Sequence, residues 1–274
     1  MIKKILILIF MLTFTINVCN AKNIDISYND GIYHIVLKGE KIKKKIKFVS
    51  SPTLITNEQA HKSFKSKLTI NTGFFDPKNQ KTISYIVNKG ETVEDPYYNE
   101  NIFANSDLRN NIDKIINRTE FRIINCNGKY IYDITPHNNS IDTSCFLETA
   151  AQGGPMLVPD LRLEEEFFIV KDGNKIIRES ASVLHKTART LIGIKNNEVH
   201  ILIVTEDNPM TIYEAANLCR EYEFEKAMAF DGGSSTSLNY KRIKVLLGHT
   251  VQKNNKKVFS KDSGRLLKSF MIIK

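Results

Sequence analysis

The chain has no tryptophan, only four cysteines and six histidines among its 274 residues. The cysteines form no CxxC pair, and the histidines show neither HExxH nor a comparable spacing. A zinc or other metal site is therefore not expected, and no sequence feature calls for a cofactor. Thirteen glycines and seven prolines are too few for a collagen-like or low-complexity chain. With 42% hydrophobic and 25% charged residues, the composition is globular and excludes disorder as the main state.

Long apolar runs are also missing, except at the start of the chain. Two lysines precede an apolar run over residues 5–14, and Cys19 and Ala21 supply small residues at −3 and −1 of a cleavage site. The run is short of the roughly 20 residues that a bilayer span needs. We predict a signal peptide over 1–21, a periplasmic or extracellular protein, and no stable membrane insertion after cleavage. The alternatives are an uncleaved anchor and a lipoprotein attached through Cys19.

The formal net charge of +9 favours anionic partners without identifying one. A lysine cluster over 41–47 could bind nucleic acid. However, Ile42, Ile46 and Phe48 alternate with these lysines, which favours an exposed strand face. Export also argues against nucleic acid, so no nucleic-acid partner is predicted.

Three cysteines remain after cleavage, and an oxidising compartment then permits one disulfide. Cys126 with Cys145 closes the shorter loop and is the favoured pair. Cys219 falls on the apolar stripe of a predicted helix over 211–222, which indicates a buried thiol. That helix begins with a capping box formed by Thr211 and Glu214.

Apolar runs punctuated by turn residues predict a hairpin-rich protein. The expected hairpins span 24–37, 83–93, 121–134, 167–177 and 191–204. Helical periodicity appears over 56–67, 106–116 and 211–222, and a short buried strand is expected over 226–230. The predicted fold class is α+β, with mostly antiparallel β-sheets and a few flanking helices. The expected organisation is a signal peptide, an N-terminal β extension over 22–52 and one domain over 53–274.

Four short segments carry potential chemistry: Asn71 to Asp76, Gln152 to Leu157, Arg189 with Thr190, and Asp231 to Ser235. Each has an ordinary structural explanation, such as a strand-to-loop corner, a glycine bend, a solvated strand end or a polar turn. The Asp231 segment could also form an anion-binding nest or hold a carboxylate on a strained turn.

In this order and spacing, the four segments resemble the phosphodiester glycosidase family, whose bacterial members have been called exopolysaccharide-biosynthesis-like proteins. The likeness extends from about Leu68 to Leu238 and makes 53–274 a phosphodiester glycosidase-like domain. The chain departs from the family pattern at Gly153, where serine is common, and at Ser234, where a third glycine is common. Residues 81–85 also lack a Pro-x-Gly that often follows the first motif, which leaves the substrate open.

The resemblance implies an exported hydrolase that cleaves the bond between an anomeric sugar carbon and a phosphodiester oxygen. N-acetylglucosamine-1-phosphodiesters and phosphorylated envelope glycans are the candidate substrates. The leaving phosphate monoester has a second pKa of about 6, so the reaction needs little general-acid help. It needs cationic or hydrogen-bonding groups on the phosphate and a carboxylate near the oxocarbenium-like carbon.

On this reading, Asp231 is the base or nucleophile, Glu206 is the second carboxylate, and Arg189 clamps the phosphate with its planar fork. The resemblance implies that Asn71 and Gln152 hold sugar hydroxyls or an N-acetyl group. The remaining substrate-binding candidates are Gly73, Phe74, Phe75, Gly153, Thr190, Gly232, Gly233, Ser234 and Ser235.

Three other functions would require different residues. A serine hydrolase based on Ser234 or Ser235 would need a GxSxG elbow or an oriented histidine. A metal-dependent phosphodiesterase would need clustered histidine and aspartate ligands. A non-catalytic module that binds phosphorylated cell-envelope glycans would keep Arg189 and the glycine turn, but would not require both Asp231 and Glu206.

Overall fold

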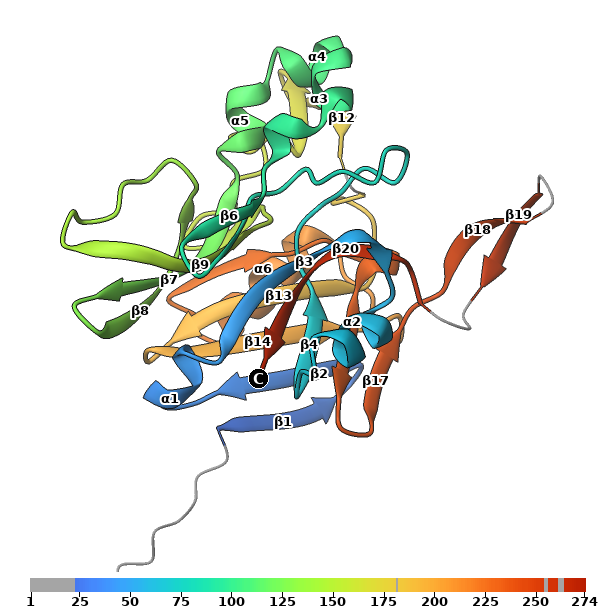
Figure 1. Ribbon diagram of the computed structural model, residues 1–274. Helices are drawn as coiled ribbons and strands as arrows, with labels where there is room; N and C mark the ends of the chain where they lie inside the picture. Colours follow the sequence, from blue (N-terminus) through green and yellow to red (C-terminus); the bar gives the residue numbers. More distant parts are fainter. Residues whose placement is uncertain (1–22, 181, 254–255, 261–263) are drawn as a thin grey trace, which may run out of the picture.

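The computed structural model describes residues 23–180, 182–253, 256–260 and 264–274 (Figure 1). The predicted signal peptide, 1–21, lies outside the described residues. Within the described part of the chain, no helix is long and apolar enough to cross a membrane.

Three antiparallel sheets make up most of the fold. In spatial order, the six-stranded sheet contains β1 (Ile24–Asn29), β2 (Ile32–Leu37), β14 (Glu198–Val204), β13 (Arg189–Lys195), β15 (Lys226–Ala229) and β10 (Met156–Val158). One five-stranded sheet contains β17 (Ile243–Leu246), β16 (Ser237–Tyr240), β4 (Leu68–Asn71), β20 (Leu267–Ile273) and β3 (Ile46–Ile55). The other contains β6 (Glu91–Glu94), β5 (Ile86–Asn88), β9 (Cys145–Gln152), β7 (Thr119–Cys126) and β8 (Lys129–Pro136).

Two separate hairpins and several short helices complete the described structure (Figure 1). The hairpins are β11 (Ile169–Asp172) with β12 (Lys175–Glu179), and β18 (His249–Lys253) with β19 (Lys256–Ser260). The α-helices are α1 (Glu40–Lys43), α2 (Asn57–Ser63), α3 (Glu100–Ala104), α4 (Ser106–Arg109), α5 (Ile112–Ile116) and α6 (Ile212–Glu221). Two 3₁₀ turns are η1 (Pro96–Tyr98) and η2 (Gly233–Ser235).

The α+β fold class and all five predicted hairpins are confirmed. The helix expected over 106–116 is instead divided into α4 and α5. Asn105 accepts hydrogen bonds from the first amides of α4, while Asn110 and Asn111 separate the two helices. Asparagine favours caps and turns because its side chain competes for backbone hydrogen bonds. The helical spacing of apolar residues over 106–116 therefore spans two short helices and the break between them.

The six-stranded sheet is covered on both faces. A core of buried residues joins it to the two five-stranded sheets. In this core Phe48 meets Phe121 and Phe230 edge-on, with ring centroids 5.8 and 6.3 Å apart. A second core lies under α6, where Ala215 and Cys219 pack with strand residues of the same sheet. The predicted capping box of α6 is present, and Cys219 is buried with a free thiol.

The expected boundary at residue 53 falls inside β3. Strand β2 pairs with β14, and β3 pairs with β20, so the segment over 22–52 shares the sheets of the main domain. The lysine-rich segment 41–47 is not the single strand face that the alternation predicted, because residues 40–43 form α1. Lys43 is only 2% exposed and donates to Tyr130 O at 3.0 Å.

The favoured disulfide is present. Cys126 and Cys145 lie opposite each other on β7 and β9 and form an S–S bond of 2.06 Å. This bond links β7 to β9, and Arg118 directly precedes β7.

Candidate active site

A cavity of about 300 Å³ lies where the three sheets and the short helices meet. This volume is at the lower end for small-molecule sites. One carboxylate, that of Asp231, and three arginines reach it among the described residues. The other lining residues are mainly apolar; the full set is Phe74, Phe75, Ile83, Ile102, Leu108, Ile115, Arg118, Arg178, Ser180, Asp231 and Arg265.

Asp231 reaches the cavity because β15 ends two residues before it. Its amide donates to Thr72 O at 2.9 Å, and its carbonyl accepts from Asn71 Nδ2 at 2.6 Å. The chain then turns at Gly233, whose φ of +57° lies in the region that glycine adopts without strain. The backbone on both sides of the Asp231 carboxylate is therefore fixed by neighbouring strands.

The environment of Asp231 raises the pKa of its carboxyl group. Burial is the main cause, since it disfavours the charged form. The positive charge of Arg265, followed by hydrogen bonds from the Ser235 hydroxyl and the Gly232 amide, acts in the opposite direction. A buried carboxyl group with a perturbed pKa in a cavity is a candidate for a functional role.

Arg265 is the residue whose positive charge acts on the Asp231 carboxylate. The sequence analysis did not identify it. Its Nη1 donates to Ser235 Oγ at 3.0 Å and to Ser234 Oγ at 3.3 Å. Its guanidinium carbon lies 5.0 Å from the centre of the Phe75 ring. Arg265 follows the aspartate turn by about thirty residues, with no motif around it, so only the packing of β20 beside β4 reveals it.

Arg118 and Arg178 supply two further positive charges. Arg118 donates from Nε to Glu166 O at 3.0 Å, and its guanidinium carbon lies 4.1 Å from the centre of the Phe168 ring. Burial lowers the pKa of Arg118 to about 10, which still leaves it charged at neutral pH. Arg178 donates to Phe167 O at 3.0 Å. Three guanidinium groups around one cavity favour an anionic ligand.

Asn71 and Thr190 lie behind the Asp231 turn and are almost fully buried. Asn71 Oδ1 accepts from Thr190 Oγ1 at 2.8 Å and from Ser237 N at 3.0 Å. Because Asn71 Nδ2 is also bonded to the Asp231 carbonyl, these two residues position the aspartate backbone and do not line the cavity.

Gln152 has a similar supporting place. It is fully buried, and its Nε2 donates to Ile116 O at 2.7 Å and to Arg118 O at 3.1 Å. Gly153 is required by packing, since an added Cβ would lie 2.6 Å from Ala229 O. Gly73 is equally confined, with Ser84 Cβ 2.6 Å from an added Cβ.

Arg189 does not face the cavity. It is 4% exposed, and its Nη2 donates to the carbonyls of Ser182, Val183 and His185 at 2.8–3.2 Å. Its Nε donates to Met210 O at 2.9 Å. The guanidinium fork thus holds a loop beside the Gly232 turn, and the cations that line the cavity are other arginines.

Glu206 likewise does not line the cavity. It is exposed after β14, and β13 lies between β14 and β15. Neighbouring Thr205 donates to Gly31 O at 2.9 Å, which fixes this loop at the β1–β2 turn. Both carboxylates follow strands that end at the same edge of the sheet, but only Asp231 lines the cavity.

Glu166 is a buried carboxylate close to the cavity. It accepts hydrogen bonds from Thr119 N at 3.1 Å, Thr119 Oγ1 at 2.7 Å and Met156 N at 3.0 Å. The pKa of Glu166 is raised, and burial of the carboxyl group is the main cause. Because its oxygens accept hydrogen bonds from the protein, Glu166 supports the loop that carries Arg118.

The described residues contain no cluster of histidine, cysteine, aspartate and glutamate suited to a metal.

The model of the phosphodiester glycosidase family matches residues 64–273. No curated protein matches the chain. Among solved structures, the catalytic domain of zebrafish N-acetylglucosamine-1-phosphodiester alpha-N-acetylglucosaminidase, auto-inhibited by its pro-peptide, is similar at 15% identity and a TM-score of 0.63. That match covers 91% of this chain and 81% of the zebrafish chain.

Two bacterial structures share the fold at lower identity. A Burkholderia pseudomallei protein designated as exported is similar at 9% identity and a TM-score of 0.56, over 88% of this chain and 73% of that one. A hypothetical protein from Synechocystis is similar at 10% identity and a TM-score of 0.53, over 92% of this chain and 61% of that one. The family match spans the residues that build the cavity, from Phe74 to Arg265, and the chain belongs to the phosphodiester glycosidase family.

Proposed function

We propose that the protein is an exported hydrolase that cleaves the bond between an anomeric sugar carbon and a phosphodiester oxygen. The observation that supports this proposal is the cavity in which Asp231, with its raised pKa, lies among Arg118, Arg178 and Arg265. A single carboxylate among several guanidinium groups suits a substrate whose reacting carbon adjoins a phosphate.

The arginines act on the leaving group. As the glycosidic bond breaks, negative charge accumulates on the phosphate, and guanidinium groups stabilise that charge without a proton transfer. A phosphate monoester has a second pKa of about 6, so it leaves as a stable anion near neutral pH. Arg265 is fixed by two serine hydroxyls, which orients its charge before substrate arrives.

Asp231 acts on the sugar carbon, either as the base that activates water or as the nucleophile. Both roles require the ionised carboxylate, which the nearby Arg265 favours and burial disfavours. Phe74 and Phe75 offer aromatic faces for the apolar face of a sugar ring. The sugar is proposed to be N-acetylglucosamine or a sugar of a phosphorylated envelope glycan.

The group beyond the phosphate has space next to this cavity. A second hollow of about 630 Å³ lies between α4–α5 and the β11–β12 hairpin, and Arg178 lines both spaces. Asn110, Asn111 and Lys114 line this second hollow and could hydrogen-bond a polar ester group.

The alternative is a non-catalytic module that binds phosphorylated cell-envelope glycans through the same arginines. The two functions differ in their need for Asp231. A binding module would tolerate or favour the neutral Asp231→Asn side chain, because it removes a negative charge beside the anion. A hydrolase would lose turnover.

Isotope transfer tests the hydrolytic mechanism. The mature chain is incubated with a sugar-1-phosphodiester in heavy-oxygen water, with a chelator present. Attack at the anomeric carbon places the label on the free sugar and leaves the phosphate monoester unlabelled. We expect this pattern with little loss of rate to the chelator. Labelled phosphate, or activity that a chelator abolishes and a divalent metal restores, would contradict the proposal.

Export is tested separately. N-terminal sequencing of protein from an envelope or culture fraction should begin at Lys22. Intact Met1 on cytoplasmic protein would contradict the predicted compartment.

A further inference from the structure

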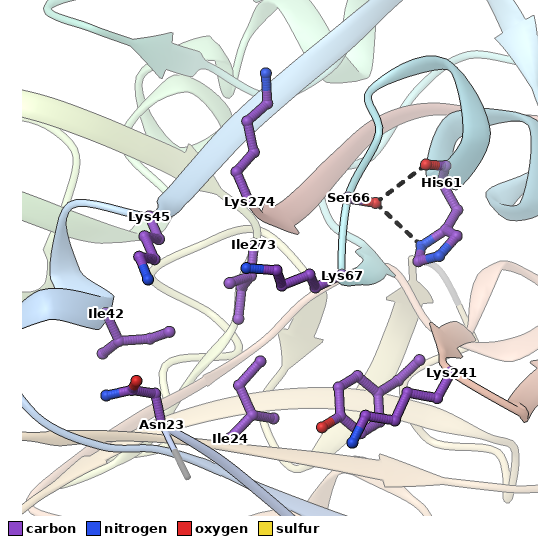
Figure 2. Close-up of a pocket in the computed structure, with 11 residues that line it drawn as sticks. Asn23, Ile24, Ile42, Lys45, His61, Ser66, Lys67, Lys241, Ile273 and Lys274 are labelled. Carbon is purple, nitrogen blue, oxygen red and sulfur yellow. Dashed lines mark hydrogen bonds between the residues drawn. The ribbon is translucent and has the colours of Figure 1, made fainter. Parts of the chain in front are cut away.

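Another cavity, of about 560 Å³ (Figure 2), does not include Asp231 and plays no part in the proposed hydrolysis. It is lined by the start of β1, the segment between α1 and β3, the end of the α2 region, the β16–β17 turn and the end of β20. β20 runs between the two sites, with Arg265 before its first residue and Ile273 at its end. Seven residues at about 3.3 Å each separate the sites by roughly 23 Å.

The rim of this cavity is cationic. Lys45, Lys67, Lys241 and Lys274 line it and are exposed, and no aspartate or glutamate is among its lining residues. In Figure 2, Lys45, Lys67 and Lys241 extend over the hollow, whereas Lys274 points away from it.

These three lysines form no ion pair with a described residue. The carboxylates on the neighbouring elements are paired with other lysines: Asp25 with Lys38 at 2.8 Å, Glu40 with Lys43 at 2.8 Å, and Glu58 with Lys62 at 2.9 Å. The acidic side chains of the adjacent elements therefore do not pair with these three lysines. Exposed ammonium groups without an acidic side-chain partner favour an anionic ligand.

The floor of the cavity is different in character. Ile42 and Ile273 are buried beneath it, and the Tyr240 ring lies 5.0 Å from the Lys241 amino group. An apolar floor beneath separated cations suits a ligand with an amphipathic body and several spaced negative charges. A single phosphate ion would fit poorly, because the site offers no arginine fork to enclose it.

We propose that this cavity is a second binding site for a phosphodiester-linked glycan, held by Lys45, Lys67 and Lys241. The choice of a glycan as the occupant rests on the proposed function. The cavity would hold one part of a polymer while another part occupies the site at Asp231. Linking two weak contacts in this way raises the overall affinity without a new contact at the catalytic site.

The test compares two variants with the same loss of charge. The first is the triple variant Lys45→Gln, Lys67→Gln and Lys241→Gln. The matched control replaces three exposed lysines on other elements, Lys89, Lys129 and Lys175, by glutamine. All six side chains are exposed, so neither variant should change the thermal midpoint by more than a few degrees.

Binding is measured by calorimetry with long-chain poly(glycerol phosphate), which has no glycosidic bond for the proposed reaction to cleave. We expect the cavity variant to weaken binding at least about tenfold. Each exposed charge contact contributes little to the binding free energy, but the three contributions add. The control should change it by less than about twofold, and added salt should weaken wild-type binding most. Equal losses in both variants, or no loss in either, would overturn the proposed site.

Two further arms separate the sources of failure. Polygalacturonate, a carboxylate polymer, should bind more weakly, and equal binding would overturn the phosphodiester assignment. A small sugar-1-phosphodiester should be hydrolysed equally by wild type and by the cavity variant. If neither protein hydrolyses it while the polymer result holds, the proposed function fails and the second site stands.

Discussion

Replacing Asp231 by asparagine should abolish turnover and stabilise the protein at the same time. The change keeps the shape of the side chain and leaves the backbone contacts to Asn71 and Thr72 in place. Removal of a positioned acid–base group or nucleophile should lower kcat by at least about a hundredfold. A residue needed only for a polar turn would show no such selective loss.

The stabilising effect follows from the raised pKa. In the folded protein, burial disfavours the ionised Asp231 more than Arg265, Ser235 and Gly232 favour it. Above the folded-state pKa, the ionised group therefore costs about 1.4 kcal/mol for each unit by which the pKa exceeds the unfolded value. Asparagine avoids this cost. For a chain of this size, 1 kcal/mol corresponds to about 2–4 °C in the thermal midpoint.

The direction of the Asp231 pKa shift also predicts how this stabilisation depends on pH. The gain should vanish below the unfolded value of 3.8, where aspartate is neutral in both states, and should grow as the pH rises from there to the folded-state pKa. Differential scanning calorimetry of wild type and variant across this range measures the gain. Asp160→Asn, at an exposed position, is the control and should change neither the thermal midpoint nor kcat appreciably. A lower midpoint together with near-native turnover would refute the reasoning and make Asp231 a structural residue.

Two further predictions concern stability. Gly154→Ala should cost about 3 kcal/mol or more in urea unfolding, because an added Cβ would lie 2.3 Å from Glu166 Oε2. Gly128→Ala has a similar left-handed φ but open space around it, so it should cost only about 1–2 kcal/mol, and equal costs would contradict the packing argument. Burial, followed by the charge of His34, lowers the pKa of His200 from 6.5 to about 4, so the free energy of unfolding should fall by about 3 kcal/mol as the pH decreases through that interval. His200→Gln should remove most of this dependence in pH-resolved urea titrations, and an unchanged slope would contradict the assignment.

The second carboxylate provides a test of the cavity geometry. The family resemblance paired Glu206 with Asp231, but Glu206 is exposed and does not line the cavity. We expect Glu206→Gln to change kcat far less than Asp231→Asn does in the same assay. A comparable loss would mean that Glu206 reaches the substrate in a conformation other than the one described.

Local pattern was sufficient for much of the fold. Alternating apolar residues around Asn127-Gly128 predicted β7 and β8, because hairpin pairing depends on neighbouring residues and on turn chemistry. The capping box at Thr211 and the stripe through Cys219 likewise predicted α6. The motif that begins with Asp231 marked the acid of the cavity, since a glycine turn after a buried strand presents the side chain beside it.

Only the tertiary structure decided which cations meet that acid. Arg189 stands in a motif, yet its guanidinium is used to hold backbone carbonyls. Arg118, Arg178 and Arg265 belong to no motif and come from three distant parts of the chain. Whether an arginine binds a ligand or a loop depends on which strands lie next to it. Those contacts are set by pairing between residues far apart in the sequence, which no local spacing records.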